Sequence, residues 1–258
     1  MFGEKNNNKL LVHLHLYYHN QLDYFISKLK NITCEYDLYV TYVTENKDSN
    51  NKLYRLKKDV HLLLLENKGY DLYPFIEIIN QVNLDNYTYI LKLHTKNYRK
   101  AYWTYNGISY IHYQWRDALV NALIGSKRIF QNNLKKLSEE HIGMIGNKDL
   151  IYHRGHIKNE GHRLQICQKL GYNPDYDEFI AGTMFLCKSY LMKDIQSLHL
   201  EAKDFDFSTS TGAVGTLAHA IESILGHTVQ NHGQKIYGRR IFSLCKVISY
   251  FRRTKEKK

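Results

Sequence analysis

The sequence predicts an α/β fold with a mostly parallel sheet covered by helices on both faces. Apolar runs typical of strands alternate with helical patterns from Leu10 to about Lys96, and four of the runs end in polar or cationic residues. Strands separated by helices need right-handed crossovers, which produce parallel sheets with both faces covered. A chain of 258 residues is long enough to bury an independent core of this kind.

The first part of the chain is predicted to contain four strands. They are LLVHLHLYY, which ends at Tyr18, then residues 36–43, residues 60–66, and YTYILKL. A helix with apolar residues from Leu22 to Leu29 follows the first strand. A polar loop with a short helix follows the second, and a helix beginning near Pro74 follows the third.

The pattern is less regular after Lys96. We expect aromatic loop material, an amphipathic helix from about Tyr113, a short strand and turn at 142–147, a loop and helix at 153–172, and a glycine-containing strand at 178–188. Residues 211–225 show an apolar helix face, with His219 and Glu222 together on another side.

Charge and composition restrict the partners. The net charge of +11 favours an anionic partner, which can be nucleic acid, an acidic membrane face or a phosphorylated small molecule. The 22 tyrosines supply flat surfaces with a polar tip that suit sugars or bases, although tyrosine also fills cores. Four scattered cysteines without a CxxC pair argue against a zinc module and a disulfide framework; they are Cys34, Cys167, Cys187 and Cys245. We interpret these cysteines as reduced and expect a cytoplasmic protein. The N-terminus lacks a signal-peptide pattern, and no apolar stretch approaches the roughly 20 residues that span a bilayer.

Polar residues close the four predicted strands, at positions 17–19, 41–42, 66–69 and 94–96. Ligands of open parallel sheets bind outside the carboxyl ends of the strands. We therefore expect these four ends to meet at one crevice, where their cations suit a phosphorylated ligand.

The stretch NKGYDLYPFIEIINQVNLDNYTYILKLHTK has the layout of glycosyltransferases of the GT-A type, which comprises a turn, a helix, and a strand that ends in a polar motif. In those enzymes the fourth strand usually ends in Asp-x-Asp, which holds a divalent metal on the donor diphosphate. Here His94-Thr95-Lys96 occupies that place. With GYDLYPF, KLHTK, AGTMF and LAHAIES, most of residues 10–228 resembles the rhamnan synthesis protein F family of bacterial polysaccharide biosynthesis.

The resemblance implies a GT-A-like domain over residues 1–230, followed by a basic C-terminal segment over 231–258. It implies a glycosyltransferase that moves rhamnose or another hexose from a nucleotide-sugar to a saccharide or lipid-linked saccharide in cell-surface polysaccharide synthesis. Fixed cations can replace a metal at the leaving diphosphate. We expect inverting transfer without a metal or other cofactor.

The cations in question are Lys96, with Arg99, Lys100 or Arg116 nearby, and His94 is expected to hydrogen-bond a phosphate or a sugar hydroxyl. The alternative is that His94 caps a buried strand and Lys96 is solvated.

The expected nucleotide-sugar site combines residues from all four strand ends. It consists of Tyr17, Thr41, Asn67, Lys68, Gly69, Asp71, His94, Lys96 and Arg116. Tyr17 and Thr41 would flank the nucleobase, while Asn67 and Asp71 would contact the sugar or ribose. The alternative for Asp71 is a helix cap, because aspartate is favoured at that position.

Inverting transfer needs a general base for the acceptor hydroxyl. Glu222 is the first choice and joins His94 and Lys96 as the expected catalytic set, with Asp204 and Asp206 as reserves. The acceptor is expected to contact Gly182, Thr183, Met184 and His219. The alternatives are that Glu222 forms an ordinary ion pair and that Gly182 marks a bulge.

Five histidines in the second half of the chain are candidate metal ligands. They are His153, His156, His162, His227 and His232. Their spacing matches no closed zinc pattern, and we predict no metal site.

The C-terminal stretch RRIFSLCKVISYFRR has an apolar core of 11 residues with arginine pairs at both ends. This pattern suits a helix lying in the headgroup region of an anionic membrane, which would make the segment from Arg239 to Lys258 a peripheral anchor on the inner face of the plasma membrane. Docking of that helix on the domain's own core remains the alternative.

Two other function classes stay open. A nucleic-acid-binding module would use the positive charge and the tyrosines, but the chain lacks an RNP motif, a zinc finger and a helix-turn-helix, and we expect no nucleic acid. A catalytically inactive scaffold would retain the GT-A-like fold without the usual metal motif.

Overall fold

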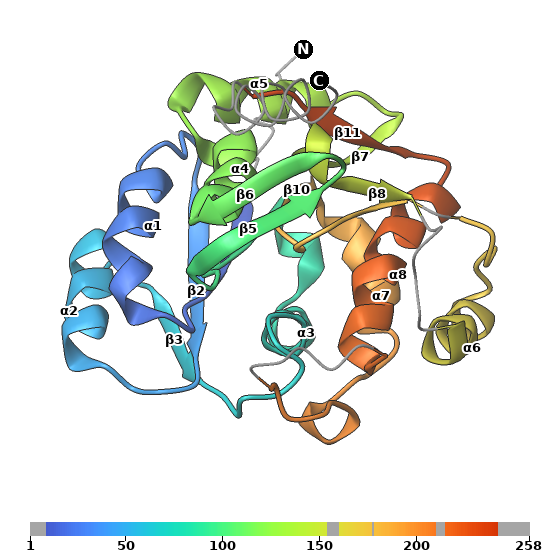
Figure 1. Ribbon diagram of the computed structural model, residues 1–258, viewed down its shortest axis with the longest axis horizontal. Helices are drawn as coiled ribbons and strands as arrows, with labels where there is room; N and C mark the ends of the chain where they lie inside the picture. Colours follow the sequence, from blue (N-terminus) through green and yellow to red (C-terminus); the bar gives the residue numbers. More distant parts are fainter. Residues whose placement is uncertain (1–8, 154–159, 177, 210–214, 242–258) are drawn as a thin grey trace, which may run out of the picture.

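The computed structural model describes residues 9–153, 160–176, 178–209 and 215–241. A seven-stranded sheet lies at its centre, in the order β11-β7-β10-β4-β1-β2-β3 (Figure 1). The strands are β1 (Leu10–His15), β2 (Tyr36–Tyr42), β3 (His61–Leu64), β4 (Tyr89–His94), β7 (Ile142–Asn147), β10 (Phe185–Lys188) and β11 (Lys235–Arg239). All pairs are parallel except those of β10, which runs antiparallel to β4 and β7. The predicted mostly parallel α/β fold is therefore confirmed.

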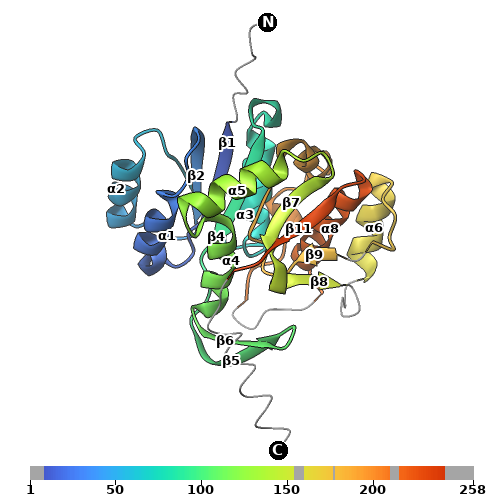
Figure 2. The ribbon, with the colours of Figure 1, turned by 90° about the horizontal axis from the view of Figure 1, so that it is seen from above.

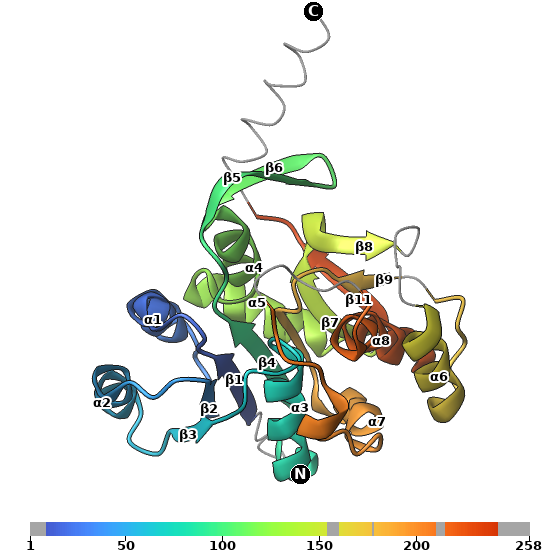
Figure 3. The ribbon, with the colours of Figure 1, turned by 60° about the horizontal axis from the view of Figure 1, so that its bottom comes forward.

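Helices cover both faces of the sheet (Figure 3). One layer contains α1 (Leu22–Leu29), α2 (Lys47–Leu56), α4 (Gln114–Ile124) and α5 (Lys127–Leu137). The other contains α3 (Leu72–Gln81), α6 (Glu160–Leu170), α7 (Met192–Gln196) and α8 (Leu217–Asn231). Short 3-10 turns are His19–Gln21, Leu84–Asn86, Lys148–Leu150, Ser189–Leu191 and Ala202–Asp204. Both layers bury apolar side chains against the sheet, as the periodicity of α1 and α3 predicts.

The chain reverses direction around β1. After β1 it builds β2 and β3 on one side, and then returns to place β4 on the other side. The carboxyl ends of β1 and β4 thus form a topological switch point, where open α/β sheets bind ligands. The Thr95 hydroxyl ties these two ends together, because it accepts hydrogen bonds from the backbone N–H groups of Tyr17 and Tyr18, both at 3.1 Å.

We expected the aromatic segment after Lys96 to be a loop. It is instead an antiparallel hairpin of β5 (Arg99–Tyr105) and β6 (Ile108–His112). Its turn is Asn106-Gly107, with φ of 46° and 71°, the backbone that two-residue hairpin turns require. The hairpin extends beyond the central sheet and its helices (Figure 2, Figure 3). The Asn106 amide donates to the carbonyls of Asp149 (3.0 Å) and Ile151 (3.2 Å), which fixes the tip.

The prediction of a single strand at 178–188 is also wrong, since this segment forms two strands in different sheets. β9 (Glu178–Ile180) pairs with β8 (Ile151–His153), whereas β10 belongs to the central sheet. Gly182 and Thr183 make the turn between them, with φ of 87° and 52°. Positive φ at both positions breaks the strand, because left-handed backbone cannot continue a ladder.

The sheet continues past residue 230, because β11 pairs with β7 up to Arg239. That strand lies within residues 231–258, the basic C-terminal segment that we expected to follow the domain. The helix predicted after Arg239 lies from residue 242 onward, outside the described residues. Within the described ranges, no helix combines the length and apolarity that crossing a bilayer demands.

Candidate active site

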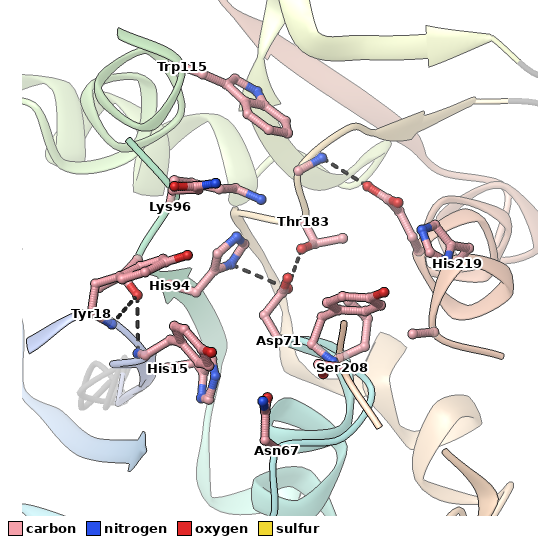
Figure 4. Close-up of a pocket in the computed structure, with 18 of the residues that line it drawn as sticks. His15, Tyr18, Asn67, Asp71, His94, Lys96, Trp115, Thr183, Ser208 and His219 are labelled. Atoms are coloured by element: carbon pink, nitrogen blue, oxygen red, sulfur yellow. Dashed lines mark hydrogen bonds and ion pairs between the residues drawn. The ribbon is translucent and has the colours of Figure 1, made fainter. Parts of the chain in front are cut away.

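A cavity of about 510 Å³ opens at the carboxyl ends of β1 and β4 (Figure 4). The residues predicted from sequence that line it are Tyr17, Asn67, Asp71, His94, Lys96, Gly182, Thr183, His219 and Glu222. Others that line it include His15, Tyr18, Tyr70, Arg99, Trp115 and Ser208. The volume is typical of a small-molecule site, and segments from seven parts of the chain converge on it.

Asp71 stands at the first turn of α3, but its side chain makes no helix-cap hydrogen bond. Its Oδ2 instead accepts hydrogen bonds from Lys92 Nζ and the Thr183 hydroxyl. Burial alone would raise the pKa of Asp71, but His94, Lys92 and Lys96 lower it more, so the net pKa lies well below that of an ordinary aspartate. Asp71 is therefore an ionised carboxylate in the pocket wall.

Lys92 lies fully buried inside β4 and was missed at the sequence level. Its ammonium donates to Asp71 and to the Thr183 carbonyl at 3.0 Å. Burial lowers the pKa of Lys92, and the charge of Asp71 opposes that shift. The signal was present in YILKL, because a lysine inside an apolar central strand requires a buried partner.

His94 ends β4 directly beside His15 of β1, its register partner. Burial lowers its pKa well below 6.5, so the imidazole is neutral at pH 7. Nδ1 lies 3.3 Å from Asp71 Oδ2, yet neither ring nitrogen has a hydrogen-bond partner within the protein. A neutral imidazole provides one donor and one acceptor, and this ring belongs to the lining of the cavity.

Lys96 and Arg99 form a cationic wall around Trp115. Lys96 Nζ lies 4.4 Å from a Trp115 ring centroid, and the Arg99 guanidinium lies 5.0 Å from it. Gln21 positions the lysine backbone by donating to the Lys96 carbonyl at 2.7 Å. Burial lowers the pKa of Lys96, against the opposing charges of Asp71 and Glu222. The wall places positive charge where an anionic ligand can reach it.

Glu222 projects from α8, one helical turn after His219, and is partly open to the pocket. Its Oε1 accepts a hydrogen bond from the Gly182 N–H at 2.9 Å. Burial raises the pKa of Glu222, and the Gly182 hydrogen bond and Lys96 oppose only part of that shift. A carboxylate with a raised pKa is a stronger base than an ordinary glutamate, which suits proton abstraction near neutral pH.

The turn at 182–183 holds both pocket carboxylates. The Gly182 N–H binds Glu222, while the Thr183 hydroxyl binds Asp71. A Cβ at Gly182 would lie 2.9 Å from Trp115 Cζ2, so a side chain there collides with the pocket wall. Glycine is required at this position by its φ of 87° and by the close approach of the indole.

Three residues expected to bind the donor do not line the pocket, and these expectations are corrected. The Thr41 hydroxyl is buried beneath it, 2.9 Å from His13 Nε2 and 3.0 Å from His15 Nδ1. Lys68 points at Glu66, with Nζ 3.2 Å from its carboxylate. Gly69 makes a turn against Phe205, where a Cβ would lie 2.6 Å from Cδ1, so it serves packing.

Arg116 and Met184 also lie outside the pocket lining. The Arg116 guanidinium stacks 3.7 Å above the Tyr24 ring centroid and donates to Asp117, so its charge is used within the protein. Met184 is fully buried in the core. Sequence spacing could not separate these residues from their pocket neighbours, because one step along a chain changes the direction of the side chain.

The reserve carboxylates Asp204 and Asp206 are exposed and do not line the pocket. Asp204 closes a capping box by accepting from the Glu201 N–H at 2.8 Å. Of the carboxylates considered as the base, Glu222 is the one that reaches the cavity.

At the end of β4, where GT-A enzymes carry their metal-binding motif, this chain has His94 and Lys96. The carboxylate there, Asp71, is already neutralised by Lys92, and Lys96 adds a further cation. In the part of the chain that the structure describes, no three or more His, Cys, Asp or Glu side chains gather as a metal site. His156 lies outside that part.

Comparison with known proteins identifies a matching family, similar sequences and a similar structure. The family model described as Rhamnan synthesis protein F matches residues 2–234. Uncharacterized protein WxcX of Xanthomonas campestris pv. campestris, from strain B100 and from strain ATCC 33913, is 26% identical over 188 residues. This match covers 66% of the chain and 24% of each relative, so the chain spans about a quarter of their length. A crystal structure of S. aureus TarS 1-349 matches with a TM-score of 0.45 and 10% identity, over 86% of this chain and 56% of that one.

Proposed function

The chain belongs to the rhamnan synthesis protein F family, and from that premise we propose that it is a glycosyltransferase. It moves a sugar, rhamnose or another hexose, from a nucleotide-sugar to a saccharide or lipid-linked saccharide in the synthesis of a bacterial surface polysaccharide. The main support is one pocket that combines a carboxylate of raised pKa, Glu222, with a cationic wall at Lys96 and Arg99. Such a pair of features serves proton abstraction and stabilisation of a leaving diphosphate.

The donor is proposed to lie across the ends of β1 and β4. Lys96 and Arg99 face its diphosphate, and the neutral His94 donates an N–H to a phosphate oxygen or a sugar hydroxyl. Tyr17, which is 40% exposed at the rim, stacks on the nucleobase, and Asn67 contacts the ribose or sugar. Asp71, which Lys92 holds ionised, accepts a hydrogen bond from a hydroxyl group of the transferred sugar.

The acceptor is proposed to enter on the side of α8. Lys96 and His219 lie on opposite sides of the pocket, and Glu222 is one turn from His219 (Figure 4). An acceptor hydroxyl oxygen attacks the anomeric carbon and gives its proton to Glu222. The bond between that carbon and the diphosphate oxygen breaks on the opposite face, and the nucleoside diphosphate leaves with its electron pair. The configuration at the anomeric carbon is inverted.

Transfer is proposed to be independent of a metal. The leaving diphosphate gains negative charge as the bond breaks, and Lys96 and Arg99 supply fixed positive charge at that point. Support comes from the donor set of the pocket, in which Asp71 is already paired with Lys92.

The Lys96→Ala variant tests this role. We expect a fall in kcat/KM of about 10²–10³, because one preorganised charge contact to the leaving group is lost. Exposed Lys100, four positions along the chain and outside the pocket lining, is the matched control, and Lys100→Ala should retain wild-type kinetics. Activity of the wild type should persist in excess EDTA. A requirement for manganese, or equal losses in the two variants, would contradict the fixed-cation proposal.

A thermal-shift screen tests the function as a whole. A nucleotide-sugar that binds the native state must raise the melting temperature, by an amount that grows with ligand concentration. We expect this rise for at least one donor, with and without divalent metal. A salt-sensitive response to oligonucleotides alone would instead favour a nucleic-acid-binding module.

The enzyme is proposed to act in the cytoplasm, at the inner face of the plasma membrane. The cations from Arg239 to Lys258 support this placement, because basic segments are attracted to anionic lipids. Binding of the full chain to vesicles containing phosphatidylglycerol, but not to neutral vesicles, is the outcome that agrees with this proposal.

A further inference from the structure

Four aromatic rings form a continuous row between the pocket and strand β8. They are Trp115, Trp103, Tyr105 and Tyr152, and we call them the aromatic row. Successive ring centroids are separated by 4.4, 5.2 and 5.2 Å, with interplanar angles of 27° to 38°. The row thus joins helix α4, the hairpin and β8, which are separate elements of the chain.

The row begins at the proposed base. Trp115 lines the pocket and lies against Gly182, whose N–H binds Glu222. It then follows the hairpin strand β5 away from the pocket. Asn106 fixes the hairpin tip to the carbonyls of Asp149 and Ile151, so the row is held at both ends.

The rings of the row are not sealed in the core. All four are partly exposed, and two carry polar groups that the protein leaves unsatisfied: Trp115 Nε1 and the Tyr105 hydroxyl are buried atoms without a hydrogen-bond partner. These two atoms are buried, so a ligand that lies along the row does not reach them. The partly exposed surfaces of the rings are what the row offers to a ligand.

We propose that the aromatic row binds the acceptor as an oligosaccharide, whose terminal sugar lies at Glu222 and whose following sugars lie along Trp103 and Tyr105. Sugars have apolar C–H faces that pack on the surfaces of aromatic rings. This inference rests on the proposed function, and it deepens that function by naming an extended saccharide as the acceptor class.

Tryptophan fluorescence can report on the row directly, because Trp103 and Trp115 are the two tryptophans of the chain. We would titrate the full chain with L-rhamnose, rhamnose disaccharides and rhamnose tetrasaccharides. Affinity is expected to rise with length, since each further sugar reaches another ring. Equal affinity for the monosaccharide and the tetrasaccharide, no response to any of the three, or a response to oligo-dT alone would overturn the proposal.

Variants on one strand separate binding from folding. Trp103→Ala should weaken tetrasaccharide binding about tenfold, measured by calorimetry. Tyr102→Ala is the matched control: Tyr102 is 45% exposed, precedes Trp103 on the same strand and is not one of the four rings of the row, so its loss should leave affinity unchanged. Tyr105→Phe removes only a buried, unsatisfied hydroxyl and keeps the ring, so it should lower neither the melting temperature nor the affinity. Equal affinities for Trp103→Ala and Tyr102→Ala would overturn the inference.

The nucleotide-sugar thermal shift separates this inference from the proposed function. If a donor raises the melting temperature while the tetrasaccharide fails to bind, the aromatic row is not the acceptor site and the proposed function stands. If no nucleotide-sugar raises the melting temperature, the proposed function is wrong, and the acceptor inference that rests on it falls with it.

Discussion

The Glu222→Gln variant is expected to lose about 10²–10⁴ in kcat while it keeps its affinity for the donor. The amide retains an oxygen that accepts the Gly182 N–H, so the local geometry is preserved. It cannot accept the proton of the acceptor hydroxyl at neutral pH. Initial rates with the acceptor, together with donor-induced thermal shifts, measure the two properties separately.

The same substitution is expected to stabilise the fold at pH 7. Burial raises the pKa of Glu222, so the native state binds this proton more tightly than the unfolded state does. The free energy of unfolding therefore falls as pH rises through the window between the unfolded pKa and the raised folded pKa. A neutral glutamine does not carry that cost, so denaturant titration should show higher stability together with the loss of activity.

The pH profile gives a third readout. The base must be ionised to work, so kcat/KM of the wild type should fall as the pH is lowered through the raised pKa of Glu222. That acidic limb should lie above the pKa of about 4.3 of an unperturbed glutamate. Asp206→Asn is the control, because this carboxylate is exposed and outside the pocket lining. Undiminished transfer by Glu222→Gln, or a comparable loss in Asp206→Asn, would rule out Glu222 as the base.

The Lys92→Met variant is expected to lose about 3–5 kcal/mol of unfolding free energy, the typical effect of removing one partner of a buried ion pair. The lysine is fully buried, and its ammonium binds both Asp71 and the Thr183 carbonyl. Methionine has a similar shape but leaves the Asp71 carboxylate without its counter-charge and the Thr183 carbonyl without the lysine donor. Guanidinium titrations of wild type and variant give this difference.

A double variant tests the cause of this loss. Lys92→Met with Asp71→Leu removes both charges, so much of the lost stability should return, because two apolar groups replace an unpaired charge. Lys136 is the matched surface control: its Nζ lies 2.7 Å from Glu139, with both side chains partly exposed. Lys136→Met should cost far less, since water screens such pairs. Equal losses at Lys92 and Lys136 would show that Lys92 is not a buried structural cation.

Both variants act on the turn at 182–183. That turn presents its N–H to Glu222, its hydroxyl to Asp71 and its carbonyl to Lys92. Loss of Lys92 should therefore lower activity in addition to stability, since the turn that positions Glu222 loses a donor. The effect on donor affinity should exceed that of Glu222→Gln, because Asp71 is proposed to contact the sugar.

Much of the fold was predictable from local patterns. The runs that became β1, β2, β3 and β4 are apolar enough to be central strands, and the helical spacing before β2 and β4 makes their pairing parallel. The convergence of Tyr17, Asn67 and His94 on one pocket follows from that topology. The hairpin was predictable too, because Asn106-Gly107 between aromatic runs is a strong turn signal that our sequence analysis did not use.

The sequence by itself thus determined the class of fold, the edge of the sheet where the pocket opens and the carboxylate that reaches it. Only the tertiary structure decided which side chains meet there. Asp71 pairs with Lys92 and Thr183, Gly182 binds Glu222, and Arg116 turns away to Tyr24. Periodicity and turn chemistry are local properties that a sequence displays directly. Contacts between distant segments depend on the direction in which each side chain leaves its element, and only the packed chain sets that direction.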